Sequence, residues 1–273
     1  MSKITNLPHV AIIGFGEVGR IFAEDFLKAG VARVTAYDTA FADKNSDASK
    51  ALAKYNVVAS ASASEAVKDA DLVFASVTAA NTLAAAQSVT AGIKKGAYYL
   101  DINSASPGVK REASAIVNQA GGRYVEAAVM VAVPPHRIAS PMFLGGTHAK
   151  DFIALVEPLG FKVTFFSDEV GRASSVKMCR SVIIKGMESL LAESMLSARH
   201  YGVEKIVLES LSDLLPAGDW EKIASYFISR TLEHGVRRAL GERVVEVLRR
   251  ARAARGDHRH VHGVRDRAQQ RQV

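Results

Sequence analysis

A glycine-rich stretch near the start of the chain has the residue types and spacing of a loop that binds a diphosphate. Its residues are Gly14, Phe15, Gly16, Glu17, Val18 and Gly19. In such a loop the first glycine makes a tight turn, the second lets a phosphate approach the backbone, and the third lets a helix pack closely on a strand. The N–H groups and the partial positive charge at the start of the helix then face the anion. We therefore predict a dinucleotide-binding site formed by these residues.

The flanking sequence supplies the strand and the helix that this loop requires. Residues 10–13 are apolar and lead directly into Gly14, and apolar residues recur at helical spacing over residues 18–27. A second apolar stretch, residues 34–37, ends at Asp38, where this unit places a carboxylate against the ribose hydroxyls of the adenosine.

Asp38 also predicts the cofactor. A carboxylate there would repel a 2′-phosphate, and no arginine follows directly, so we expect NAD to be preferred. NADP is the alternative, because Lys44 could reach a phosphate. A further alternative is that Asp38 only caps a turn.

Composition narrows the class of protein. The chain has 273 residues, of which 48% are hydrophobic, enough for one large or two moderate domains. A single cysteine, Cys179, excludes an intrachain disulfide, and no apolar stretch reaches the roughly 18 to 20 residues of a membrane span. We expect a cytoplasmic protein with a small-molecule substrate, no membrane partner and no metal.

The net charge of +7 is unevenly distributed along the chain. Residues 241–273 contain nine arginines, no lysine and four acidic residues, so the rest of the chain is nearly neutral. We therefore do not expect a nucleic-acid partner. The arginine-rich tail is interpreted as an out-of-frame translation or, alternatively, as a natural basic arm.

Short apolar runs alternate with helical stretches in the first part of the chain. The runs are residues 56–59, 72–77, 98–102, 124–127, 142–144 and 162–166. This alternation predicts a doubly wound parallel sheet, the Rossmann arrangement, with helices on both faces. Ser106 followed by Pro107 predicts a capped helix start within this region.

Beyond residue 167 the pattern becomes entirely helical. Helices are predicted over residues 173–201, 203–215 and 220–240. We expect three parts: a dinucleotide-binding domain at residues 1–166, a helical substrate and dimerisation domain at 167–240, and the anomalous tail at 241–273.

Residues 8–240 resemble the β-hydroxyacid dehydrogenase superfamily, which includes 3-hydroxyisobutyrate and 6-phosphogluconate dehydrogenases. The resemblance rests on the glycine loop, on residues 100–104 followed by Pro107, and on residues 171–177, which look like the family's catalytic-lysine motif. Residues 129–135 and 177–181 are most similar to a bacterial phosphogluconate-dehydrogenase-like branch.

The resemblance implies that Lys177 is the general acid or base. Oxidation of a hydroxyl group by hydride transfer leaves a proton to remove, and reduction of a carbonyl group needs one supplied. The alternative is a surface lysine whose stem lies along a long helix.

This chain departs from the family pattern on the substrate side. Arg180 and Ser181 stand where the family has two asparagines, and Ser181, one helical turn after Lys177, is a candidate donor to the substrate. Residues 126–132 read Glu-Ala-Ala-Val-Met-Val-Ala, without the Ser-Gly-Gly of many members. Met130 and Val131 therefore predict either a more apolar substrate pocket or simple packing at a strand end.

Four further residues complete the predicted site. Ser104 matches a family position near the nicotinamide and the substrate, or it belongs to a helix-capping turn. Val77 and Thr78 follow a strand at its carboxyl end, where nucleotide contacts collect. His234 is a candidate substrate residue, or part of an exposed basic helix face.

Together these features predict an NAD(P)-dependent oxidoreductase that acts on a small hydroxy acid or related carbonyl compound, as a homodimer. Two alternatives stay open: an imine or keto reductase on the same scaffold, and a protein that binds NAD(H) without turnover.

Overall fold

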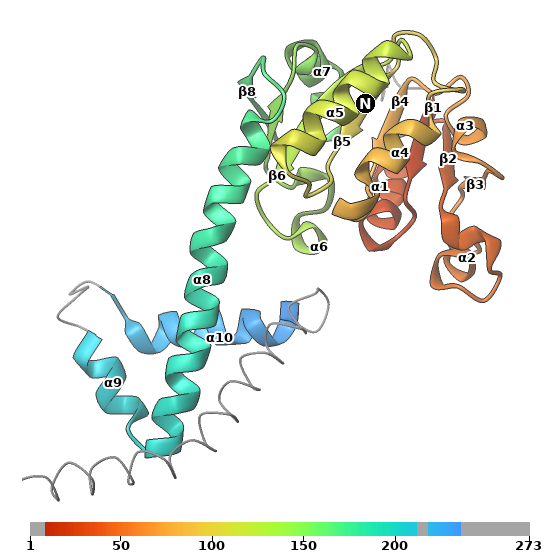
Figure 1. Ribbon diagram of the computed structural model, residues 1–273. Coiled ribbons are helices and arrows are strands. Elements are labelled where there is room, and N and C mark those ends of the chain that lie inside the picture. Colours follow the sequence, from red (N-terminus) through yellow and green to blue (C-terminus); the bar gives the residue numbers. More distant parts are fainter. Residues whose placement is uncertain (1–8, 212–217, 236–273) are drawn as a thin grey trace, which may run out of the picture. The chain divides into compact units, whose positions relative to one another are not determined.

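The computed structural model describes residues 9–211 and 218–235 (Figure 1). The chain divides into two compact units, residues 1–180 and 181–273. The predicted tail at 241–273 lies outside the described residues, as do the last residues of the two helices predicted at 203–215 and 220–240.

Eight strands of the described residues form a single sheet in the first unit, in the order β3-β2-β1-β4-β5-β6-β7-β8. The strands are β1 (His9–Ile13), β2 (Arg33–Tyr37), β3 (Val58–Ala59), β4 (Leu72–Ala75), β5 (Tyr98–Asp101), β6 (Arg123–Val129), β7 (Met142–Gly145) and β8 (Val163–Ser167). Strand order reverses between β1 and β4, which is the position where open sheets of this kind bind their ligands. The predicted Rossmann-type fold is confirmed.

The strand pairs are parallel with one exception. β6 and β7 pair antiparallel, with Val129 opposite Met142, so the predicted parallel sheet contains one antiparallel pair. A parallel crossover needs a connecting segment long enough to return along the sheet, usually a full helix. The β6–β7 connection contains only the four-residue helix α6 (Val133–His136) and the short 3-10 helix η3 (Arg137–Ala139), so the chain turns back instead.

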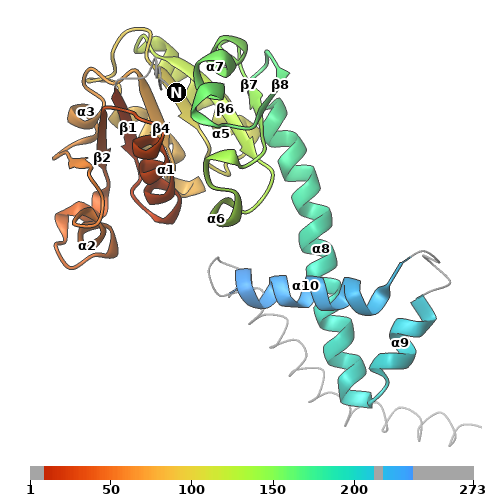
Figure 2. The same ribbon diagram turned by 180° about the vertical axis from the view of Figure 1, so that it is seen from behind.

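Helices cover both faces of this sheet. They are α1 (Glu17–Lys28), α2 (Asp47–Leu52), α3 (Ala63–Ala66), α4 (Thr82–Ser88), α5 (Pro107–Gln119) and α7 (Ala149–Val156), with short 3-10 helices η1 (Thr39–Ala42), η2 (Ala79–Asn81) and η4 (Glu157–Leu159). Figures 1 and 2, seen from opposite sides, show α4 and α5 on one face and α1 and α7 on the other.

The strands bury side chains in two separate cores because successive residues point to opposite faces. Val10 and Ile12 of β1 pack with Phe22 of α1, whereas Ala11 and Ile13 pack in the core beneath α3, α4 and α5. Both sides of β1 are therefore fully covered, as expected for a central parallel strand.

The second unit is built from helices. The long helix α8 (Arg172–Tyr201) begins in the first unit and continues into the second, where α9 (Glu204–Ser210) and α10 (Trp220–Gly235) follow. Leu191 of α8 packs with Ala224 and Phe227 of α10. Among the described helices, none combines the length and the apolar character needed to cross a membrane.

Candidate active site

The glycine loop connects β1 to α1 and shows three different steric situations. At Gly14, where φ is +95°, an added Cβ would lie 2.5 Å from the carbonyl oxygen of Ser76, and at Gly19 it would lie 2.1 Å from that of Gly14. At Gly16 no heavy atom of the described residues lies within 4 Å of the added Cβ. The fold itself therefore requires glycine at 14 and 19. At 16 it leaves open space of the kind that a bound diphosphate would use, so the loop fits a dinucleotide.

The side chains of the loop are divided between core and surface. Phe15 is fully buried, and its ring lies edge-on to Phe41 and Tyr55, with centroids 5.8 and 5.9 Å apart. Phe15 can thus offer a ligand only its backbone. Glu17 is exposed and Val18 partly exposed at the start of α1, beside the open position at Gly16.

Asp38 follows β2 and ties the loop to its neighbour. Its Oδ2 accepts a hydrogen bond from the N–H of Phe15 at 2.7 Å, and its Oδ1 accepts one from the N–H of Ala40 at 2.8 Å. The turn-capping role left open by the sequence is thus present, together with a contact to the glycine loop. Because a carboxylate oxygen can accept more than one hydrogen bond, this arrangement leaves capacity for ribose hydroxyls.

The ends of β4 and β5 lie at the same edge of the sheet. Ser76 Oγ donates to the carbonyl of Gly14 at 2.9 Å, and the N–H of Val77 donates to Asn103 Oδ1 at 2.7 Å. Thr78 also follows β4 at this edge, and its Oγ1 accepts a hydrogen bond from Asn81 Nδ2 at 3.1 Å. Hydrogen bonds therefore connect the ends of β1, β2, β4 and β5 where a nucleotide is expected.

Asn103 is a residue of this edge whose role the sequence did not predict. Its side chain is 4% exposed, and its Nδ2 has no hydrogen-bond partner in the part of the chain that the structure describes. An unpartnered buried amide is costly, which favours a site completed by a ligand. The sequence signal was weak, because an asparagine after a strand is also a common turn residue.

Lys177 and Ser104 meet across the fold of the first unit. Lys177 Nζ, on the second turn of α8, donates a hydrogen bond to Ser104 Oγ at 2.8 Å. Ser104 is exposed just beyond β5. The cap of α5 is Ser106, whose Oγ accepts from the N–H of Val109 at 3.4 Å, so the alternative of Ser104 as the helix cap is corrected. Two of the three residues predicted as catalytic, Lys177 and Ser104, are thus in direct contact, and the third is Ser181.

Glu126 positions the start of α8, a function that the sequence did not reveal. This fully buried side chain accepts hydrogen bonds from the N–H groups of Gly171 at 2.6 Å and Ser174 at 2.8 Å. A carboxylate at a helix N-terminus is favoured both by these donors and by the helix dipole. Lys177 lies less than one turn beyond Ser174.

Residues 9–159 match the sequence profile of the NAD binding domain of 6-phosphogluconate dehydrogenase. The chain belongs to this family. The predicted resemblance to β-hydroxyacid dehydrogenases is confirmed. The domain that defines the family binds NAD, which agrees with the predicted cofactor class, NAD(P).

Sequence relatives of this 6-phosphogluconate dehydrogenase family member include an uncharacterised 28.5 kDa protein of Methanothermus fervidus. It is 25% identical over 204 residues, which cover 75% of this chain and 76% of that protein. The mitochondrial 3-hydroxyisobutyrate dehydrogenase of Mus musculus is 23% identical over 77% of this chain, and the match spans 63% of the mouse enzyme.

Solved structures of the same fold include a conserved hypothetical protein from Sinorhizobium meliloti, with 36% identity, a TM-score of 0.69, and coverage of 84% of this chain and 77% of that one. A conserved protein whose structure is similar to 3-hydroxyacid dehydrogenases has 27% identity and a TM-score of 0.67, covering 84% of each chain. An imine reductase from Myxococcus stipitatus, solved with NADP+, has 20% identity and a TM-score of 0.62, covering 83% of this chain and 78% of that one.

The loop after β6 differs from the usual pattern of the β-hydroxyacid dehydrogenases. Met130 and Val131 follow the last residue of β6, and the side chain of Val131 is 38% exposed. Arg180, which stands where the family has an asparagine, contacts this loop: its Nη1 donates a hydrogen bond to the carbonyl of Met130 at 3.3 Å.

Two predicted substrate residues belong to the second unit. Ser181 is partly exposed on α8, four positions after Lys177. His234 lies in α10, but its side chain is outside the described part of the structure. Its neighbour Arg230 is paired with Glu188 at 2.8 Å, which compensates one of the positive charges of the predicted basic face. Among the described residues there is no group of three metal-ligating side chains.

Proposed function

We propose that this protein is an NAD(P)-dependent oxidoreductase that transfers a hydride between a nicotinamide cofactor and a small hydroxy acid or a related carbonyl compound. The observation that carries the proposal is the 2.8 Å contact between Lys177 Nζ and Ser104 Oγ. It joins an amine and a hydroxyl group beside the strand ends that fit a dinucleotide. The homology to hydroxyacid dehydrogenases supports the reaction class.

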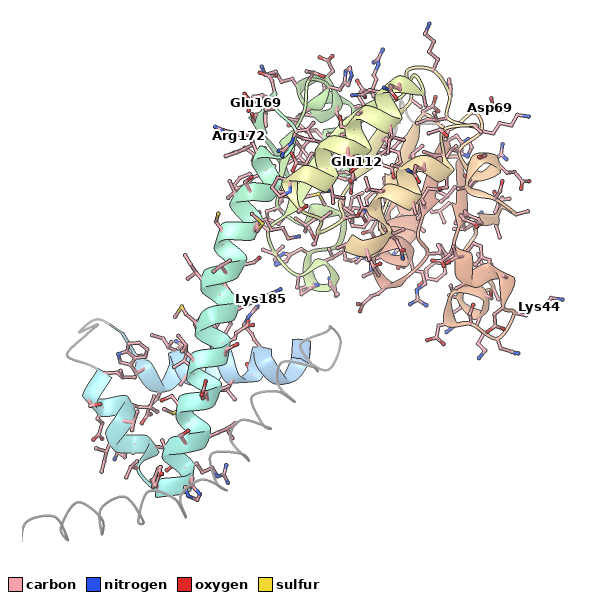
Figure 3. The ribbon with its side chains drawn as sticks, in the orientation of Figure 1. Lys44, Asp69, Glu112, Glu169, Arg172 and Lys185 are labelled. Carbon is pink, nitrogen blue, oxygen red and sulfur yellow. The ribbon has the colours of Figure 1, made fainter. Side chains whose placement is uncertain are left out.

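In this proposal the cofactor, when bound, supplies the site that accepts or gives the hydride. The glycine loop would hold the pyrophosphate, with Gly16 leaving room for it, and the carboxylate of Asp38 would accept hydrogen bonds from the adenosine ribose. Val77, Thr78 and Asn103 line the edge between these groups and Ser104. NAD is the expected cofactor, because the carboxylate of Asp38 would repel a 2′-phosphate. Lys44, the cation that would bind such a phosphate in the alternative, is exposed in the segment between η1 and α2 (Figure 3).

Lys177 is proposed to act as the general base or general acid at the substrate oxygen. In the direction of oxidation the neutral amine of Lys177 takes the hydroxyl proton as the hydride leaves carbon, and in the direction of reduction the ammonium gives this proton to the new alkoxide. Ser104 accepts one N–H of Lys177 and thereby orients Nζ.

Met130, Val131, Ser181 and His234, which the sequence predicts as substrate residues, stay part of the proposal. The exposed apolar side chain of Val131, in place of the Ser-Gly-Gly sequence, also supports a second candidate: a reductase of imines or ketones with apolar substituents. The imine reductase among the structural neighbours makes this chemistry compatible with the fold.

A homodimer is part of the proposal, and sedimentation velocity would test it.

A substrate panel distinguishes the two candidates. The purified full chain would be incubated with NAD or NADP and 3-hydroxy acids, and separately with NADH or NADPH and cyclic imines or ketones, while absorbance at the nicotinamide band is followed. Turnover of hydroxy acids supports the first candidate, and turnover of imines or ketones alone supports the second. Tight binding of NADH without turnover in either panel would refute both and leave a cofactor-binding protein.

A further inference from the structure

Two buried carboxylates stand next to each other in neighbouring strands. Asp101, the last residue of β5, and Glu126, in β6, are directly paired in the parallel register. Both side chains are fully buried. Because a buried carboxylate is costly unless it is hydrogen-bonded or paired, the partners of each indicate what it stabilises.

Asp101 stabilises the turn that carries Ser104. Its Oδ1 accepts the N–H of Asn103 at 2.9 Å and lies 2.8 Å from Nζ of the fully buried Lys110. Lys110 also donates to the backbone carbonyl of Asp101 at 2.8 Å. The ion pair of Asp101 and Lys110 therefore fixes the backbone at Asp101 and at Asn103. Ser104 directly follows Asn103.

Tyr124 binds the other carboxylate oxygen of Asp101. Its hydroxyl group donates to Asp101 Oδ2 at 2.6 Å. Burial, and then the charge of Asp101, raise the pKa of Tyr124 well above its usual range, so this hydroxyl group stays protonated and acts as the donor. Tyr124 thus offers a way to perturb Asp101 while leaving its contacts to Asn103 and Lys110 in place.

Glu126 stabilises the other partner of the contact. By accepting the N–H groups of Gly171 and Ser174, it fixes both the height and the rotation of the first turn of α8. An α-helix is rigid over one turn, so the position of Lys177 follows from that of Ser174. The two carboxylates are attached to adjacent strands of one sheet, which leaves little freedom between the elements that they hold.

We propose that Asp101 and Glu126 are a matched pair of positioning residues, one setting Ser104 and the other setting Lys177, so that the Lys177–Ser104 contact is fixed from the interior of the sheet. The catalytic purpose of that contact rests on the proposed function. The positioning itself does not, and it can be measured without a substrate.

The test uses competitive acylation of lysines by a trace of acetic anhydride, with peptides quantified by mass spectrometry. The readout is the acylation rate of Lys177 relative to Lys185, an exposed lysine on α8 (Figure 3). Glu126→Gln keeps the shape of the side chain but turns an N–H donor toward one of the two helix N–H groups. We expect this change to displace Lys177 from Ser104. The ratio of the Lys177 rate to the Lys185 rate should then rise about threefold or more, since the hydrogen bond between the Lys177 ammonium and Ser104 is lost.

The Asp101 side is tested with the double substitution Asp101→Asn and Lys110→Met, which removes both buried charges and leaves neither unpaired. The same increase in the ratio is expected. The matched control is Tyr124→Phe, which removes one buried hydrogen bond from the same cluster and should lower the melting temperature while leaving the ratio at the wild-type value. Circular dichroism selects variants that fold, and Glu126→Asp, which keeps the charge, replaces Glu126→Gln if the latter does not fold.

The outcomes separate positioning from general stability. If the Glu126 and Asp101 variants lose stability as Tyr124→Phe does but keep the wild-type ratio, both residues are only structural and the proposal is wrong. A raised ratio in a protein that turns over no substrate supports the positioning role and refutes the proposed oxidoreductase function. Where a substrate is found, the same variants should lower kcat with little change in NADH affinity.

Discussion

Asp25 of α1 and Arg137 of the β6–β7 connection form a two-point ion pair, with Arg137 Nε and Nη2 at 2.9 and 2.7 Å from Asp25 Oδ1. Asp25 is 8% exposed, and its Oδ2 also accepts the N–H of Ile138 at 3.0 Å. Arg137 has a φ of +54°, a conformation that costs a non-glycine residue free energy and persists only where surrounding contacts maintain it. The pair thus holds the loop beyond Met130 and Val131 against the helix that follows the glycine loop.

Loss of this pair should destabilise the first unit. Asp25→Ala leaves the guanidinium and the N–H of Ile138 without their acceptor, and we expect a loss of about 2 to 3 kcal/mol in the free energy of unfolding. Glu24, whose carboxylate also reaches Arg137 at 2.7 Å but is 38% exposed, is the control. Glu24→Ala should cost less than about 1 kcal/mol, because exposed ion pairs contribute little. Urea denaturation measures both, and equal losses would contradict the assignment.

The glycine loop predicts opposite behaviour at neighbouring glycines. Gly16→Val should leave the melting temperature unchanged, since its side chain would project into open space, but should weaken NADH binding by at least about 100-fold by filling the place of the pyrophosphate. Gly19→Ala should instead impair folding, because its Cβ would meet the Gly14 carbonyl oxygen. NADH fluorescence titration and thermal unfolding separate these effects. Unchanged NADH affinity in folded Gly16→Val would remove the assignment.

Cofactor preference tests the role of Asp38. We expect NAD to be favoured over NADP by about tenfold or more in kcat/KM, the range of one charge-dependent contact. Asp38→Asn should reduce this ratio, since the repulsion of the 2′-phosphate is lost while one hydrogen-bond acceptor remains. The Lys44→Ala variant is the control for the alternative. A wild-type preference for NADP that Lys44→Ala abolishes would show that Lys44 reads the ribose.

Replacement of Lys177 tests the chemical step. Lys177→Ala should lower kcat by roughly 100- to 10,000-fold, the range for removal of a general acid or base, with NADH affinity nearly unchanged. Lys185→Ala, on the same helix, should have no effect on kcat. Near-normal turnover of Lys177→Ala on a substrate identified with the panel would show that Lys177 has no part in proton transfer.

His9 gives a prediction about pH. Its side chain is 5% exposed, and its Nε2 lies 2.9 Å from Thr35 Oγ1. Burial, followed by the charge of Arg33, lowers the pKa of His9 below its ordinary value of 6.5. The unfolded chain therefore binds a proton at His9 more readily than the folded one, so stability is fully present above about pH 6.5 and decreases as the pH falls through that value toward the folded pKa. His9→Gln should flatten this part of the stability profile in urea titrations at several pH values.

The sequence alone determined the features that depend on near neighbours. The strand, the glycine loop and α1 were predictable together because the loop directly follows an apolar strand and the helix shows its apolar period within a few turns. The cap at Ser106 before Pro107 and the uninterrupted α8 were equally local. Apolar runs at regular intervals sufficed for the Rossmann class, since a buried parallel strand is apolar on both faces.

The tertiary structure alone decided which distant residues meet. Lys177 and Ser104 are 73 positions apart, and their contact depends on the pairing of β5 with β6 and on the carboxylate of Glu126 beneath α8. The reversal of β7, the loop held by Asp25 and Arg137, and the buried amide of Asn103 likewise follow from strand order and packing. No residue pattern along the chain encodes them, because each hydrogen bond joins groups whose approach is set by the whole sheet.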